Sequence, residues 1–165
     1  MANFNPFHQP IIGSRPIVLL STGTAVTVTG TTTETILKTV LVPGGLVGKY
    51  GSIRLTCIFS YTNVANIKTW RVRLGGISGT AFITGAVTTT SNTLAARTIT
   101  NRGSYSSQVC WVAGSTAAGS GGANNLITGT IDTSVDQNLV VTGQVANAAD
   151  FVTIESCIVE VFPAD

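Results

Sequence analysis

The sequence predicts an all-β protein, built as a sandwich or a barrel, and three observations support this prediction. Threonine, a β-branched residue that suits the pleated surface of a sheet, occurs 26 times in 165 residues. Short apolar runs, several of them alternating with polar residues, follow one another along the chain. The 18 glycines and 13 serines punctuate these runs, as turn residues do. No run shows the periodicity of an amphipathic helix.

The first 16 residues are predicted to form an extended N-terminal arm. They contain three of the five prolines, which fix the backbone and remove hydrogen-bond donors, and they show no periodic pattern. A free tail would leave their large apolar side chains in water, so we expect the arm to bind a partner or a neighbouring subunit. A leader that folds back locally or is disordered is the alternative. The predicted partner-binding residues of the arm are Phe4, Phe7, Ile11 and Ile12.

The remainder, residues 17–165, is predicted to form one β-sandwich domain of about 8–10 strands. A loop of small residues is expected over 114–125, and the breaker Pro-Gly-Gly at 43–45 ends one strand. The runs that predict strands are, in order, 16–21, 24–30, 33–42, 52–62, 68–76, 80–85, 94–101, 106–114, 125–132, 138–147 and 151–162.

Two of these runs alternate clearly enough to assign their faces. In residues 52–62 the odd positions from Ile53 to Tyr61 are apolar or aromatic, which indicates a half-buried strand. In residues 68–76, Trp70 shares a face with Val72 and Leu74, whereas Arg71 and Arg73 lie on the other face. Trp70 is therefore predicted in the core, and the two arginines on an exposed or partner-facing surface. A basic and aromatic nucleic-acid surface would need the ring and the charges on one side.

The last run, residues 151–162, does not keep one pattern. Val152, Ile154 and Ile158 have the same parity, but Val159 and Val161 have the opposite one. We therefore expect a β-bulge in this strand, or burial of both faces at its end.

The residues that catalysis or metal binding would require are scarce. The only histidine, His8, lies in the arm, so a Ser-His-Asp triad cannot be assembled in the β-domain. Asp132 and Asp136 form the only close acidic pair in a loop, and neither their number nor their spacing suits calcium or glycoside hydrolysis. The glycines of residues 74–79 are not followed by a helix that could hold a phosphate. We therefore predict that the protein is not an enzyme and needs no cofactor or metal.

Charge and cysteine content exclude further classes of protein. A net charge of +2 with scattered basic residues is too small for a general nucleic-acid binder. Cys57, Cys110 and Cys157 lie in apolar runs without CxxC spacing, which favours buried thiols in a reducing compartment over a disulfide framework or zinc site. No stretch approaches the ~20 apolar residues of a membrane span, and the first residues lack the features of a secretory signal. Synthesis in a host cytoplasm is expected.

The order of several segments resembles a group of bacteriophage structural proteins with jelly-roll domains, which act as head decoration (cement) proteins and as tail or fibre components. The resemblance covers residues 30–162 and rests on "TTTETILKTVLVP", "GGLVGKYGSIRLTCIFSYTN", "NIKTWRVRLGG", "RTITNRGSYSSQ" and "ADFVTIESCIVEVF". It implies an antiparallel β-sandwich of jelly-roll type that associates with itself, most often as a homotrimer. It also implies a virion location on the outer surface of the phage head, where such oligomers clamp neighbouring major capsid proteins and stabilise the shell.

The alternative function is a tail or fibre component that binds a host receptor or glycan. Such a module would present an exposed aromatic platform, for which Trp111 and Tyr105 are the candidates. Because Trp111 shares its parity with Val109, we instead expect a core position for its ring.

Overall fold

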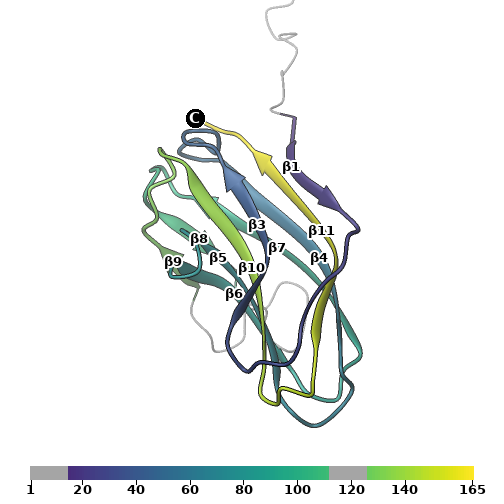
Figure 1. The fold of residues 1–165 in the computed structure, drawn as a ribbon. Helices are drawn as coiled ribbons and strands as arrows, with labels where there is room; N and C mark the ends of the chain where they lie inside the picture. Colours follow the sequence, from purple (N-terminus) through teal and green to yellow (C-terminus); the bar gives the residue numbers. More distant parts are fainter. Residues whose placement is uncertain (1–14, 112–125) are drawn as a thin grey trace, which may run out of the picture.

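The computed structural model describes residues 15–111 and 126–165, which contain eleven β-strands and no helix (Figure 1). Accordingly, nothing in these two ranges is a helix long and apolar enough to cross a membrane. Each of the eleven runs that predicted a strand overlaps one, and three of these strands, β2, β8 and β9, have only three residues each. The eight longer strands agree with the predicted number.

The strands form two antiparallel sheets that pack face to face (Figure 1). The larger sheet has the order β1 (Ile17–Thr22), β11 (Val152–Phe162), β4 (Ser52–Tyr61), β7 (Asn92–Asn101), β8 (Gln108–Cys110) and β9 (Ile127–Gly129), with β2 (Val26–Val28) also paired to β11. The smaller sheet has the order β3 (Thr35–Val42), β10 (Gln137–Val145), β5 (Lys68–Leu74) and β6 (Thr80–Val87).

The connectivity of the eight longer strands is that of a jelly roll. Their order along the chain is β1, β3, β4, β5, β6, β7, β10 and β11. The first pairs with the last, the second with the seventh, the third with the sixth and the fourth with the fifth. This nested pairing, divided between two sheets, is the jelly-roll arrangement. The predicted fold class, an antiparallel β-sandwich of jelly-roll type, is therefore confirmed.

The core lies between the sheets and is centred on stacked aromatic rings. The ring of Phe59 on β4 stacks on Trp70 of β5, with 4.9 Å between the ring centroids, and joins one sheet to the other. Gly85 on β6 makes room for the indole, because a Cβ at that position would lie 2.3 Å from Trp70 Cε2. Core positions were predicted for the odd-numbered residues from Ile53 to Tyr61 and for Trp70, Val72 and Leu74. These predictions are confirmed, since all of these side chains are buried.

The bulge expected in the last strand is present. The register between β11 and β4 shifts between Ile154 and Ser156. Two residues of β11 therefore pass where β4 advances by one, and the side chains that follow exchange faces. Ile154 points into the core before the shift, Cys157 and Val159 do so after it, and Ile158 is turned outward.

Candidate functional site

The two arginines predicted to face a partner lie on the outer face of the smaller sheet, and both are bound to one carboxylate. Glu34 receives both side chains, with Arg73 Nε 2.9 Å from Glu34 Oε1 and Arg71 Nη1 3.1 Å from Glu34 Oε2. Arg73 also donates to the carbonyl oxygen of Gly79, and Glu34 accepts a hydrogen bond from the buried Thr142 hydroxyl. The prediction that the two arginines lie on the face opposite to Trp70 is confirmed. Their guanidinium groups are, however, half-buried and bound mainly to other groups of the same chain.

Replacing Glu34 with glutamine is expected to cost about 2 kcal/mol of unfolding free energy at about pH 7, because two half-buried arginines lose their counter-charge. The hydrogen bond from Arg73, helped by Thr142 and the charge of Arg71, lowers the pKa of Glu34 below its ordinary 4.5. A carboxyl whose pKa is lower in the folded state than in the unfolded state stabilises the folded state at pH values above the unfolded-state pKa. This contribution is lost as the pH falls through the lowered pKa of the folded state.

Urea unfolding of the natural chain and Glu34→Gln at about pH 7 and about pH 3 measures this contribution. The difference between the two proteins should shrink at the lower pH, and a difference that does not change would contradict the assignment. Glu160→Gln is the matched control, since the Arg54 side chain that it pairs with is 47% exposed and such a pair contributes at most about 1 kcal/mol.

The outer face of the larger sheet carries an apolar strip made of Ile58, Leu94 and Ile158. Their exposed fractions are 45%, 66% and 39%. Ile58 and Leu94 stand directly opposite each other on β4 and β7. Ile158 on β11 lies diagonally from Ile58, because Ser156 pairs with Ile58. Directly opposite and diagonal neighbours on one face of a sheet lie within reach of each other, so the three side chains border one surface.

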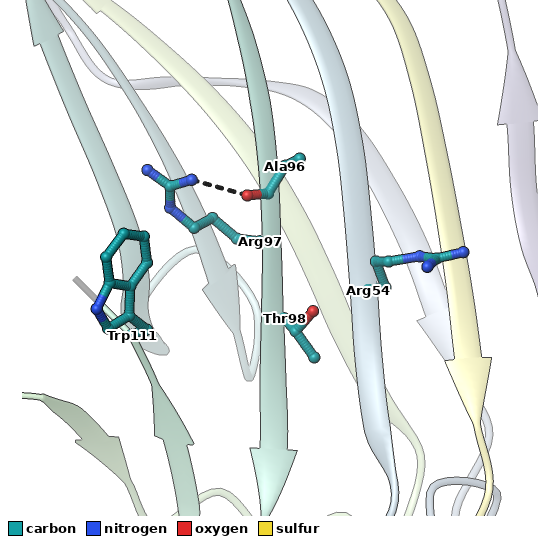
Figure 2. A pocket seen from close by; sticks show the side chains of 5 residues that line it. All are labelled: Arg54, Ala96, Arg97, Thr98 and Trp111. Carbon is teal, nitrogen blue, oxygen red and sulfur yellow. Dashed lines mark hydrogen bonds between the residues drawn. The ribbon is translucent and has the colours of Figure 1, made fainter. Parts of the chain in front are cut away.

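Trp111 is exposed, and the core position expected for it is wrong. Its ring is 40% exposed, and the guanidinium carbon of Arg97 lies 5.4 Å from the ring centroid. Gln108 and Cys110 point inward instead, so the parity of this strand places Trp111 outside. Figure 2 shows the indole beside β7, with Arg97 extending towards it and Arg54 extending the opposite way, towards β11.

Two shallow cavities meet at the pair formed by Arg97 and Trp111. The outer cavity, about 300 Å³ in volume, is also lined by Arg54, Ala96 and Thr98 (Figure 2). The inner cavity, about 310 Å³, extends towards β6. Its lining comprises the same pair together with Trp70, Phe82, Ile83, Thr84, Gly85 and Ile127. Tyr105, the other aromatic candidate, is placed elsewhere, with its hydroxyl 3.2 Å from Asp165.

The three cysteines are buried and unbridged, as predicted. Cys57 and Cys157 are cross-strand partners with their sulfur atoms 2.8 Å apart. The hydrogen bond to Cys157, together with burial, raises the pKa of the Cys57 thiol. Burial raises the pKa of Cys110 to about 11, although the charge of Arg97 opposes this shift. Cys57 and Cys110 therefore lack the lowered pKa of a reactive thiol. The hydrogen bond from Cys57 lowers the pKa of Cys157, although burial opposes this shift.

No group of three metal-binding side chains occurs within residues 15–111 and 126–165. Asp132 accepts hydrogen bonds from the backbone and hydroxyl of Ser134, which is a local turn interaction. The predicted partner-binding residues Phe4, Phe7, Ile11 and Ile12, and also His8, lie outside the described residues.

No protein-family profile and no curated protein sequence matches this chain. Among solved structures, one titled "Structure of infectious bursal disease virus Gx strain" contains a chain that is similar, with a TM-score of 0.40 and 15% identity. The alignment covers 90% of this chain and 32% of the viral chain, so this chain spans less than half of its length.

Proposed function

We propose that this chain is a non-enzymatic structural protein of a bacteriophage virion, which decorates the outer surface of the head. In this role it clamps neighbouring major capsid proteins and stabilises the shell, and it associates with itself as a homotrimer. The observation that carries the proposal is the apolar strip of Ile58, Leu94 and Ile158 on the outer face of a jelly-roll sheet.

The strip supports protein contact because exposed apolar side chains gain free energy when a partner removes them from water. Clusters of this kind, rimmed by polar groups, mark protein interaction surfaces. Here the rim is supplied by the ion pair between Arg54 and Glu160 and by the hydrogen bond between Ser60 and Glu155. In this proposal the N-terminal arm adds a second contact, so that many copies on one lattice hold the shell together.

Co-sedimentation of the full-length chain with undecorated capsids of the phage that encodes it tests the proposal. We expect saturable binding, reduced at least about tenfold by Leu94→Ser, because this substitution removes the most exposed side chain of the strip. Thr88→Ala, at an exposed polar residue between β6 and β7 that is not part of the strip, is the control and should bind normally. A natural chain that does not bind capsids would overturn the decoration role.

A second candidate function is a tail or fibre component that binds a host receptor or glycan. The exposed ring of Trp111, stacked with Arg97, is the aromatic platform that such a module requires. Retention of the chain on host cells, with no retention on capsids, would favour this function over decoration.

A further inference from the structure

We propose that Arg97 and Trp111 form the centre of a binding site for an acidic saccharide, a sugar that carries a carboxylate. This inference rests on the second candidate function and names the class of ligand and the residues that would hold it. The residues that line it belong to β4, β5, β6, β7 and β9, together with Trp111 directly after β8, and all of them are described.

The first support is the free charge of Arg97. The described ion pairs are those of Arg54 with Glu160 and of Arg71 and Arg73 with Glu34, so none of them includes Arg97. Its Nη1 donates to the carbonyl oxygen of Ala96, and within residues 15–111 and 126–165 no other hydrogen bond of this guanidinium occurs. A guanidinium of this kind binds carboxylates through charge-assisted, paired hydrogen bonds.

The second support is the accessible face of Trp111. An indole binds the apolar C–H face of a sugar ring while the polar groups of the sugar remain hydrated. Because Arg97 lies over the same indole, a carboxylate held by the guanidinium would place its sugar ring against Trp111. The two cavities on either side of the pair, at about 300 and 310 Å³, are at the small end of the range for ligand sites. They suit one or two sugar units.

The third support is an unsatisfied donor at the inner cavity. Trp70 lines this cavity, is 5% exposed, and its Nε1 has no hydrogen-bond partner among the described residues. A buried N–H without an acceptor costs free energy and is rare in folded proteins. Gly85 lies beside this nitrogen, since a Cβ there would be 2.4 Å from it. Because this nitrogen is itself buried, a sugar oxygen in the inner cavity would supply the missing acceptor only once the groups beside it shift.

A nucleotide would also combine a ring with negative charge, but the site is poorly suited to one. Binding of phosphates relies on several clustered cations, and the nearest additional arginine lining these cavities, Arg54, is held by Glu160. A single free guanidinium fits the single charge of a carboxylate better.

The experiment is a titration of the full-length chain with a hexuronate disaccharide, monitored by tryptophan fluorescence. The matched ligands are the corresponding neutral disaccharide and a nucleoside monophosphate. The chain has two tryptophans, so Trp111→Phe reports Trp70 alone, at the inner cavity. We expect the acidic sugar to bind at least about tenfold more tightly than either matched ligand.

Arg97→Gln should weaken binding of the acidic sugar about tenfold or more and remove the preference over the neutral sugar. Arg102→Gln, at an exposed arginine that lines neither cavity, should leave binding unchanged. Trp111→Phe keeps an aromatic face, so it tests the ring without emptying the position, and circular dichroism confirms that each variant is folded.

Three results would overturn the inference. They are the absence of binding by the natural chain, equal binding of the acidic and neutral sugars, and equal affinity of Arg97→Gln and the natural chain. Retention on host cells that survives Arg97→Gln would also overturn it, while leaving the tail or fibre function in place. A natural chain that neither binds the acidic sugar nor is retained on host cells would remove that function as well.

Discussion

Phe59→Ala is expected to lower the free energy of unfolding by about 4 kcal/mol, the largest effect predicted for a single side chain. The ring is completely buried and stacks on Trp70 at 4.9 Å and on Tyr61 at 6.3 Å between centroids. Its removal loses the transfer free energy of the ring and leaves a cavity that a rigid two-sheet core closes only in part.

The neighbouring residue provides the control for this prediction. Ile58→Ala truncates a side chain on the same strand that points outward and is 45% exposed, so we expect a loss of about 0.5 kcal/mol. Urea unfolding followed by tryptophan fluorescence measures both variants. Similar losses in the two would mean that the faces of β4 are assigned wrongly.

Gln108→Leu is expected to cost about 3 kcal/mol, although leucine is similar in volume and more apolar. Gln108 Nε2 donates to Asn101 Oδ1 at 3.0 Å and to the carbonyl oxygens of Tyr105 and Ile131, and its Oε1 accepts from the backbone N–H of Ile131. Leucine would leave these buried groups without partners, and the cost of desolvation would no longer be offset.

The loss of stability in Gln108→Leu should be concentrated in β8 and β9, because the hydrogen bonds of Gln108 join β8 to Ile131, just beyond β9. Amide hydrogen exchange of β8 and β9 should become faster in Gln108→Leu, while β4 and β11 keep their protection. Gln137→Leu, which removes a single hydrogen bond to the carbonyl oxygen of Asp132, is the control, with an expected cost within about 1 kcal/mol. A stable Gln108→Leu with unchanged exchange would contradict the role of this network.

Much of the fold could be predicted because period-two alternation reports burial locally. The faces of β4 and β5 and the bulge of β11 follow from apolar spacing within a few residues. Strand pairing does not, since β1 pairs with β11 at the opposite end of the chain. The nested order of the jelly roll was therefore predicted only from the resemblance to phage proteins. The observed strand pairs establish it.

The candidate site was harder to predict, for physical reasons that particular residues show. On the three-residue strand β8, parity alone does not say which face is inside, and the polar Gln108 is buried only because Asn101 and Ile131 satisfy it. That network turns Trp111 outward. Likewise, nothing local to Arg73 indicates that its partner Glu34 lies 39 residues away.

The central claim, that the chain reinforces a phage head, is tested most directly by heating capsids with and without it. The measurement is the temperature at which packaged DNA becomes accessible to a dye. Saturating amounts of the natural chain should raise this temperature, and the Leu94→Ser variant at the same concentration should raise it less. Capsids that bind the natural chain but release their DNA at an unchanged temperature would contradict the claim.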